Sequence, residues 1–355
     1  MKSQMIVAYA QPLQERDLAV PTPVGTEVLV RVRFCGVCHS DVHIHDGYFD
    51  LGNDKKLDLS GAHQLPFTLG HEIEGEVVAV GPDAGGVTIG QRCVIYPWIG
   101  CGHCPTCRRG DEQLCDKPQA IGVNRAGGFA DYVIVPDRRY LLDCAGIADG
   151  LAATYMCSGL TAYGALQKIG PLASGETIVI IGLGGVGSMA LQFARAILPD
   201  TRITCIDVDD SKLVAATRYG ADQVINSSQQ DAVREIRKQT IDGVHTVLDF
   251  VGAEASLNLA QRAVRKGGKV IVVGLFGGRI SLSIPLFPLR ALSIVGSYVG
   301  SLQGAAEMLA LVKTGVVSPI AIEKRPLDQA GQSLDDLRQG RINGRVVLDC
   351  SGQVT

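Results

Sequence analysis

Four cysteines crowd into one short stretch of the chain. Cys101, Cys104, Cys107 and Cys115 lie within 15 residues, separated by two, two and seven positions. Zinc favours a tetrahedron of thiolates, and short spacings let a single loop wrap the ion at little cost in closure entropy. The residues between them are mostly polar, which argues against four unrelated core cysteines. Because four protein ligands leave no open position, we expect this zinc to be structural.

A glycine-rich turn lies between a short apolar run and a helical pattern. The run 177–181 is followed by Gly182, Gly184, Gly185, Val186 and Gly187 in the pattern GxGGxG. After a strand and before a helix, such glycines permit a tight turn, a close approach of the backbone to a pyrophosphate, and helix–strand packing. The N–H groups at the start of the helix then face the phosphates. The segment therefore predicts a dinucleotide site.

An acidic residue follows that turn at a suitable interval. Asp207 stands 20 positions after Gly187, at the end of the next predicted strand. There a carboxylate hydrogen-bonds the adenosine ribose and repels a 2′-phosphate, which favours NAD over NADP. The competing interpretation is that Asp207 only caps the helix starting near Ser211, a role that Asp209 or Asp210 could equally fill.

A second set of metal-binding residue types is dispersed. Cys38, His71 and Cys157 lie far apart in the chain. Taken singly, each is more typical of a buried small residue or a hydrogen-bonded histidine than of a ligand. Their assignment to one site therefore needs support from the surrounding segments.

The elements that must position these residues fall into two patterns. Residues 1–150 contain short valine-rich runs such as 27–32 and 76–81, broken by turn residues, which indicates a mainly β domain. Beyond residue 158 strands alternate with helices, as in a doubly wound parallel sheet. Strands are predicted at 177–182, 202–207, 221–225, 246–250 and 269–273, and helices through 192–195 and at 211–218, 231–239 and 255–264.

The domain limits follow from the change of pattern. We expect a zinc-bearing domain at 1–157, a dinucleotide-binding domain at 158–289, and a return of 290–355 to the first domain. The stretch 48–66 is polar, and we expect it to form a surface loop.

Bulk properties exclude several classes of protein. The chain has 355 residues, of which 46% are hydrophobic and 19% charged, and a net charge of −3. This fits a globular two-domain protein and gives no basic surface for nucleic acid or an anionic membrane. No run is long enough to span a bilayer and no secretory signal is recognisable, so the expected location is the cytoplasm. Clustered cysteines in a reducing compartment favour metal binding over a disulfide framework. The acidic balance and the absence of a basic helix argue against a nucleic-acid-binding zinc module.

At these residues the sequence resembles the zinc-dependent medium-chain alcohol dehydrogenases. The resemblance runs through GVCHSD (36–41), GHE (70–72), the four-cysteine segment, CSGLTAY (157–163) and GLGGVG (182–187), in the family's order. It implies an α/β protein with a chaperonin-10-like β-rich catalytic domain plus a doubly wound parallel Rossmann domain. It also implies NAD and two zinc ions per chain, with Cys38, His71 and Cys157 as ligands of the catalytic zinc and a fourth position open to water or substrate.

The resemblance assigns further roles near that zinc. Glu72 would lie beside the metal, where the family's glutamate can exchange as a ligand. Asp41 would orient His71, a role compatible with capping a helix. Ser40 and His43 match the proton relay, although His45 competes with His43. Cys35 is expected to pack in a strand rather than bind metal.

Cofactor contacts carry over less tightly. Thr161 is expected near the nicotinamide, Lys212 at the adenosine ribose, and His39 at the pyrophosphate, where relatives often have arginine. Arg345 resembles a phosphate contact near the C-terminus, and Arg341 competes for that role.

Several alternatives remain. The predicted substrate is a small alcohol, aldehyde or ketone. Polyol-type relatives usually have glutamate where Cys157 stands, and zinc-free quinone reductases lack the three ligands. A non-catalytic dinucleotide-binding protein would have lost some of the ligand or relay residues.

A homodimer or homotetramer through the Rossmann sheets is expected, with 284–299 apolar enough for the contact. Loop 51–61 is longer than in many relatives and borders the substrate cleft, so the pocket is not transferable; the candidate walls are Trp98, Tyr48, Phe49 and Phe287.

Overall fold

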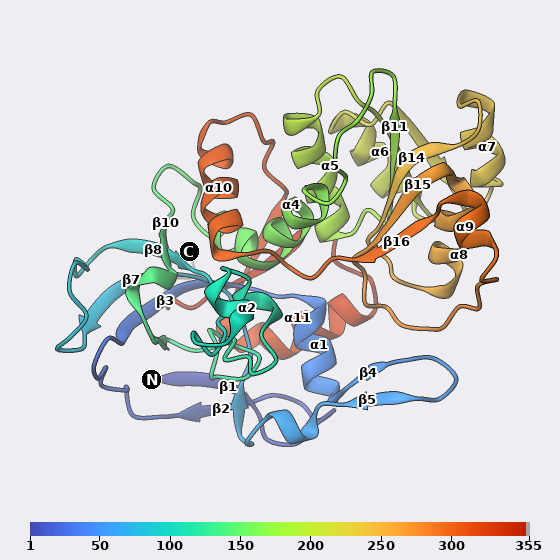
Figure 1. Ribbon diagram of the computed structural model, residues 1–355. Coiled ribbons are helices and arrows are strands. Elements are labelled where there is room, and N and C mark those ends of the chain that lie inside the picture. The colour runs from blue at the N-terminus through green and yellow to red at the C-terminus, as the bar shows by residue number, and fades with distance from the viewer. Residues whose placement is uncertain (353–355) are drawn as a thin grey trace.

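The computed structural model describes residues 1–352 and divides into a strand-rich part and a part built on one parallel sheet. Figure 1 shows the strand-rich part at lower left, formed by the N-terminal half of the chain together with its C-terminal end, and the parallel sheet with its helices at upper right. The two predicted patterns therefore correspond to separate regions in space.

The strand-rich part is organised around one seven-stranded sheet. Six strands follow the order β10-β8-β7-β3-β18-β17, and β9 pairs with β3. A three-stranded sheet, β2-β1-β6, and a hairpin, β4-β5, complete this part. The strands are β1 (Lys2–Ile6), β2 (Gln14–Asp17), β3 (Val28–Gly36), β4 (Tyr48–Asp50), β5 (Lys56–Asp58), β6 (Phe67–Thr68), β7 (Glu72–Val80), β8 (Arg92–Ile95), β9 (Tyr132–Val135), β10 (Leu141–Asp143), β17 (Ile322–Pro326) and β18 (Arg345–Asp349).

Few helices accompany these strands. They are α1 (His39–Asp46), α2 (Pro105–Arg108), α3 (Leu151–Thr154) and α11 (Ala330–Arg338). Two further helices, α4 (Leu160–Leu166) and α10 (Leu302–Lys313), pack on each other, and α4 also packs against the parallel-sheet part. Between α3 and α4 the chain makes a π-helical turn, Tyr155–Gly159. Turns of this kind are rare and occur often at functional sites.

The second part is a six-stranded, entirely parallel sheet. Its order is β13-β12-β11-β14-β15-β16, so the chain starts in the middle at β11 and moves first to one edge and then to the other. The strands are β11 (Thr177–Ile181), β12 (Arg202–Asp207), β13 (Gln223–Asn226), β14 (Val244–Asp249), β15 (Val264–Val272) and β16 (Ser293–Gly296). The helices are α5 (Gly185–Ile197), α6 (Asp210–Arg218), α7 (Ala232–Gln239), α8 (Glu254–Ala263) and α9 (Leu286–Arg290).

Burial explains why the central strand has its sequence. Every residue of β11 is buried, as expected for a strand covered on both faces. Two apolar clusters fill the molecule, a large one that runs through the strand-rich part into the sheet around α5 and a smaller one on the side of α7 and α8. The large cluster is continuous between the two parts, which fixes their contact.

The structure corrects the limits of the predicted elements in two places. β16 pairs in parallel with β15, so the dinucleotide-binding sheet extends beyond the predicted limit of residue 289. The stretch 48–66 is not a simple loop, because β4 and β5 pair antiparallel from Tyr48↔Asp58 to Asp50↔Lys56. Side-chain patterning gave no warning of this hairpin, since its β5 strand is exposed throughout.

The C-terminal end does return to the first part. β18 pairs antiparallel with β3, where Leu348 lies opposite Cys35 and Val347 opposite Gly36. This pairing brings residues near 345 beside the segment that precedes Cys38. None of the helices in residues 1–352 has the length and apolar character needed to cross a membrane.

Candidate active site

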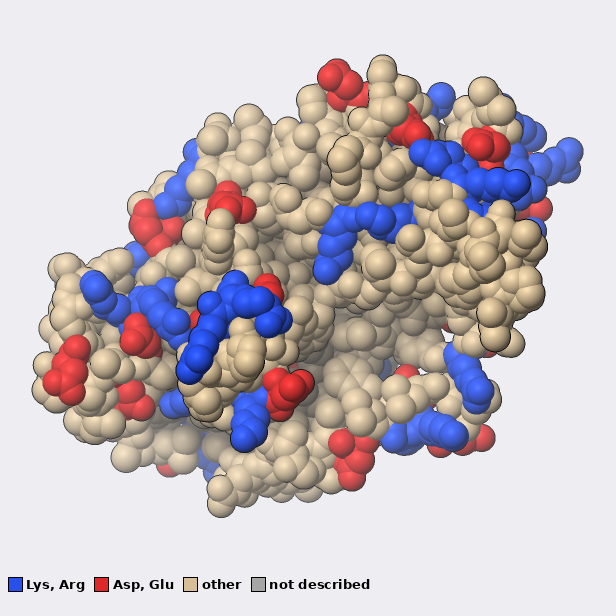
Figure 2. All heavy atoms as spheres, in the orientation of Figure 1, with Lys and Arg blue, Asp and Glu red and all other residues tan. Residues whose placement is uncertain are grey.

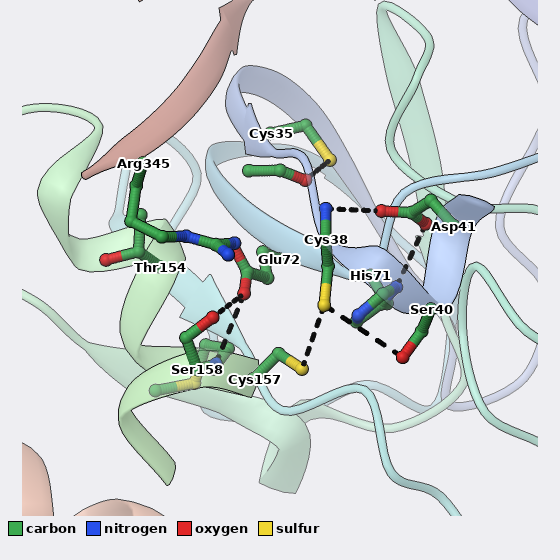
Figure 3. A network of polar contacts seen from close by, with 12 residues as sticks. Cys35, Cys38, Ser40, Asp41, His71, Glu72, Thr154, Cys157, Ser158 and Arg345 are labelled. Carbon is green, nitrogen blue, oxygen red and sulfur yellow. Dashed lines mark hydrogen bonds and ion pairs between the residues drawn. The ribbon is translucent and has the colours of Figure 1, made fainter. Parts of the chain in front are cut away.

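Cys38, His71 and Cys157, which are far apart in the sequence, come together in the folded chain. One donor atom from each of Cys38, His71 and Cys157 lies within 4.8 Å of the others, and all three residues are buried. Cys38 precedes α1, His71 precedes β7, and Cys157 sits in the π-helical turn. Figure 3 shows the two thiols and the imidazole turned toward one another.

The distances suit a zinc ion. The Sγ atoms of Cys38 and Cys157 are 3.8 Å apart. A tetrahedral zinc with Zn–S bonds of about 2.3 Å places two sulfurs about 3.8 Å apart. The Nε2 atom of His71 is buried and has no hydrogen-bond partner among the residues described. A buried polar atom without a partner is costly, so a metal at this point would satisfy the nitrogen as well as the thiols.

Asp41 fixes the orientation of His71. One carboxylate oxygen, Oδ1, lies 3.1 Å from Nδ1 of His71, and the other accepts the Cys38 N–H at 2.9 Å. The same side chain therefore caps α1 and holds the histidine, so the two predicted roles coexist. Burial by itself lowers the pKa of His71, but Asp41 and Cys38 together outweigh it and hold the pKa well above its usual value. A more basic imidazole binds metal more strongly.

The two thiols differ in acidity. The neighbouring Cys157 thiol is the main cause that holds the pKa of Cys38 well below its ordinary value, and His71 acts in the same direction against burial. The thiolate is the form that binds metal. Cys38 is therefore prepared for ligation.

The residues assigned to the relay lie on one helix. Ser40 and His43 are three positions apart on α1 and so share a face. Ser40 Oγ lies 3.9 Å from Cys38 Sγ, and the ring of His43 packs 4.6 Å from the ring of Phe49. His45, the rival, is buried and holds Gln11 O at 2.8 Å through Nε2 and Asp46 at 3.1 Å through Nδ1. Both nitrogens of His45 are thus engaged in packing α1 against neighbouring segments.

Glu72 does not belong to the cluster of ligands. Its carboxylate accepts hydrogen bonds from Ser158 and forms an ion pair with Arg345. Burial raises the pKa of Glu72 to about 7, although Arg345 opposes the shift. Cys35 is also outside the cluster and is buried in β3, as expected.

The four-cysteine segment forms a second candidate metal site. The four thiols come together within 4.8 Å, with Sγ–Sγ distances of 3.9 Å between Cys101 and Cys107, 3.5 Å between Cys104 and Cys107, and 3.9 Å between Cys104 and Cys115. Backbone N–H groups lower the pKa of Cys101 to about 6. These spacings again fit thiolates around one zinc.

The glycine-rich turn joins β11 to α5 with a separate reason for each glycine. Gly182 has a φ of +86°, and a Cβ on Gly187 would lie 1.7 Å from the carbonyl oxygen of Gly182. Gly184 precedes α5, is exposed, and has open space where a Cβ would be. The first N–H groups of α5 have no side-chain cap and are available to a phosphate. Val186 is half-buried in the first turn of this helix.

Asp207 ends β12 beside this turn. Its Oδ2 atom accepts the Leu183 N–H at 2.6 Å, and its Oδ1 atom accepts the Val208 N–H at 2.8 Å. The capping role belongs instead to Asp209, which precedes α6 and accepts the Ser211 N–H at 2.8 Å. The competing interpretation of Asp207 as the cap of α6 is therefore wrong.

The remaining cofactor candidates lie around the same region. Thr161 is half-buried on α4, Lys212 is half-buried on α6, and His39 is exposed at the start of α1. Arg345 is only 4% exposed, and a Cβ on Gly185 would lie 2.5 Å from its Cδ atom. The arginine therefore lies beneath the glycine-rich turn and pairs with Glu72, while Arg341 is exposed and bound to Asp336.

The aromatic residues predicted to line the substrate pocket differ in what they contact. Trp98 is buried 5.4 Å from the ring of His71 and 5.8 Å from the ring of Tyr298, and its Nε1 donates to Met156 O at 2.9 Å. Tyr48 packs instead against Lys56 of the same hairpin. Phe287 is half-buried and packs against the smaller core cluster in the parallel-sheet part.

Two residues near the site escaped prediction. Ser158, the residue after Cys157, binds Glu72, and Gly36 leaves the space that Glu72 occupies. Ser158 lies inside the CSGLTAY segment, so its position beside a ligand was the available signal. For Gly36 the signal was weaker, because only the pairing of β3 with β7 reveals what lies opposite it.

Comparison with known proteins places the chain in a family. Residues 25–145 match the family described as alcohol dehydrogenase GroES-like domain, and residues 185–314 match the family described as zinc-binding dehydrogenase. A NAD-dependent alcohol dehydrogenase of Sulfurisphaera tokodaii is 39% identical over 350 residues, which cover 98% of this chain and 99% of the relative. One from Saccharolobus solfataricus has the same identity and coverage.

Solved structures agree. The alcohol dehydrogenase of Aeropyrum pernix superposes with a TM-score of 0.88 at 28% identity, covering 98% of this chain and 100% of that one. Acetophenone reductase from Geotrichum candidum, solved in complex with NAD, gives a TM-score of 0.83 at 30% identity, covering 98% and 96%. The predicted family and fold class are confirmed. The chain therefore belongs to the zinc-dependent medium-chain alcohol dehydrogenases, a family of nicotinamide-dependent oxidoreductases.

Proposed function

We propose that this chain interconverts small alcohols with the corresponding aldehydes or ketones, using NAD and a catalytic zinc held by Cys38, His71 and Cys157. The observation that carries the proposal is the buried Nε2 atom of His71, which faces two thiols and has no other partner among the residues described. Relatives named NAD-dependent alcohol dehydrogenases support the choice of cofactor.

The chemistry divides between the metal and the protein. When bound, zinc would supply Lewis acidity that lowers the pKa of an alcohol. Asp41 keeps the ring of His71 in place, and the indole of Trp98 packs beside that ring to exclude water. Ser40 and His43, on one face of α1, lead a proton from the buried site toward the surface.

In this proposal the cofactor binds at the carboxyl ends of the parallel strands, where the glycine-rich turn and Asp207 lie. The N–H groups at the start of α5 face its pyrophosphate, and Gly184 lets the backbone approach closely. The Asp207 carboxylate accepts hydrogen bonds from the adenosine ribose, and the Lys212 ammonium donates to it. His39 contacts the pyrophosphate, and Thr161 contacts the nicotinamide side. Figure 2 shows a hollow between the two parts of the molecule, with acidic and basic side chains interspersed around it.

Two alternatives remain distinguishable by experiment. A D-arabinose dehydrogenase of Sulfolobus solfataricus superposes with a TM-score of 0.84 at 26% identity, so a sugar or polyol is the second candidate substrate. Cys157 favours the alcohol branch, because glutamate is usual at that position in polyol-type relatives. A non-catalytic dinucleotide-binding role is disfavoured because the three ligands come together and Ser40 and His43 are retained.

For the assembly we propose a homodimer or homotetramer formed through the parallel sheets. β16 is an edge strand of that sheet as described, and the chain that leads into it carries exposed apolar side chains at Phe276, Ile284 and Leu289. Unpaired edge strands and exposed apolar patches mark association surfaces.

For the cellular location we propose a reducing compartment such as the cytoplasm. All eleven cysteines are free of disulfides, which supports it.

Initial rates across a panel of substrates test the function. Primary, secondary and aromatic alcohols and polyols are compared, with NAD and NADP in parallel. The proposal requires turnover of simple alcohols with NAD at a higher kcat/KM than polyols. A preference for NADP would contradict the role of Asp207, and activity confined to polyols would favour the second candidate.

A further inference from the structure

The carboxylate of Glu72 is held from two sides by side chains that the zinc chemistry does not use. Ser158 donates to Oε1 twice, through its hydroxyl at 2.8 Å and its backbone N–H at 3.2 Å. The guanidinium of Arg345 pairs with the other oxygen, Oε2. Figure 3 shows these contacts running from the π-helical turn through Glu72 to Arg345 on β18.

Gly36 lies against the Glu72 carboxylate on a third side. Gly36 of β3 lies opposite Glu72 in the sheet register. A Cβ atom on Gly36 would lie 2.0 Å from Oε2 and 2.9 Å from the Cβ of Glu72. Glu72 and Ser158 are completely buried, and Arg345 is 4% exposed. The carboxylate is therefore confined to one orientation by contacts inside the protein.

This orientation matters because of where the residues lie in the chain. Glu72 directly follows the ligand His71, and Ser158 directly follows the ligand Cys157. Even so, the described residues whose donor atoms gather within 4.8 Å at this site are only Cys38, His71 and Cys157. Carboxylate oxygens are good zinc ligands. An anionic oxygen this close to the site, if free to turn, would compete with the substrate for the fourth position.

We propose that Ser158 is a positioning residue that, together with Arg345, holds the carboxylate of Glu72 away from the metal and so keeps the fourth position open to substrate. The inference rests on the proposed function, because it requires a metal at the three ligands. Ser158 is completely buried and is assigned this role through its two hydrogen bonds to Glu72.

Ser158→Ala removes the hydroxyl and leaves Oε1 with the weaker N–H bond alone. With cobalt exchanged for zinc in the full-length protein, we expect the visible absorption spectrum of the free enzyme to change, since a fourth protein oxygen replaces water. Imidazole, a probe of the open position, is expected to bind about ten-fold more weakly, the factor that loss of one hydrogen bond to a charged group gives. KM for the alcohol should rise more than kcat falls.

Ser256→Ala is the matched control. The Ser256 hydroxyl also donates at 2.8 Å to a buried carboxylate, that of Asp249, but in the parallel sheet rather than at the ligands. Its removal should leave the cobalt spectrum and the affinity for imidazole unchanged. Ser158→Thr keeps the hydroxyl and should retain the wild-type spectrum if the added methyl group is accommodated.

A double variant separates a local effect of Ser158 from one transmitted by Glu72. In the Glu72→Gln background the competing anionic oxygen is absent, so Ser158→Ala should no longer change the spectrum or imidazole binding. An unchanged spectrum and unchanged imidazole binding in the single Ser158→Ala variant would overturn the inference. So would an equal change in both backgrounds. A wild-type protein that binds no metal at the three ligands would instead overturn the proposed function.

Discussion

The two cysteine clusters of this protein have nearly the same sulfur spacing but very different surroundings. Sulfur atoms are 3.5–3.9 Å apart in the four-cysteine segment and 3.8 Å apart between Cys38 and Cys157. In the first cluster one polar loop supplies all four thiols, and Cys101 and Cys104 are half-exposed. In the second, three residues from distant segments are all buried.

Under the proposed function, this difference would make the four-cysteine site structural and the buried site catalytic. Four thiols complete a tetrahedron and leave no place for a substrate, whereas two thiols and one imidazole leave one position. The buried cluster also lies between the strand-rich part and the parallel sheet, where a cofactor can approach. The two clusters therefore differ in the number, type and burial of their ligands, whereas their sulfur spacing is similar.

Removal of one buried ligand should have the largest effect on activity. Cys38→Ala is expected to lower kcat/KM by about 10³-fold or more, because a Lewis-acid metal supplies several kcal/mol of transition-state stabilisation. Steady-state kinetics and zinc analysis of the same preparation provide the measurement. If the variant lost activity while still carrying the wild-type amount of zinc, the assignment of Cys38 as a ligand would be wrong.

Replacing Asp41, which hydrogen-bonds His71, should lower activity less than removing a ligand does. Asp41→Asn is expected to reduce metal affinity or activity about 10- to 100-fold, as for other residues that orient a metal-bound histidine. Metal affinity is measured by incubating the protein with increasing chelator concentrations and assaying the activity that remains. Asp46→Asn, on the same helix but paired with Arg338, is the control and should leave metal affinity at the wild-type value.

The proposed relay distinguishes two histidines on α1. His43→Ala should lower kcat by up to about 10²-fold, the lower end of the range for proton transfer by a positioned side chain, and should alter the pH profile. His45→Ala should lower the melting temperature without altering that profile, because the His45 ring ties α1 to Gln11 through Nε2 and lies 3.3 Å from Arg338 of α11 through Nδ1. A change of the profile by His45→Ala alone would exchange the two assignments.

The smallest effect on turnover should come from the exposed cluster. Cys101→Ser is expected to release one zinc per chain and to lower thermal stability, because metal binding contributes directly to folding. The kcat measured at low temperature should fall less than about two-fold, since the four cysteines form a group separate from the buried cluster among the residues described. A loss of turnover comparable with that of Cys38→Ala would end the distinction between the two clusters.

The predictability of the two clusters from sequence also differs, for a physical reason. The four-cysteine site is local, so spacing alone reveals it. The dispersed ligands become recognisable only through the segments around them, because sequence separation hides which strands pair. The pairing of β18 with β3 brings Arg345 beside Glu72, and no local pattern specifies that contact.

The same limit explains the errors in the fold. Strong strand–helix alternation located the parallel sheet from β11 to β15, but β16 follows a long irregular segment and was assigned to the wrong part. The exposed β4–β5 hairpin has no buried face, so its sequence resembles a loop. Asp209 rather than Asp207 caps α6, a distinction between neighbouring carboxylates that the sequence left open.

Zinc stoichiometry tests the central claim most directly. Native mass spectrometry of wild type, Cys101→Ser and Cys157→Ser counts the ions on each chain, and the same samples are assayed for alcohol oxidation with NAD. The account predicts two ions in wild type and one in each variant, with activity lost only in Cys157→Ser. One ion or none in wild type, or full activity in a Cys157→Ser chain that has lost an ion, would contradict it.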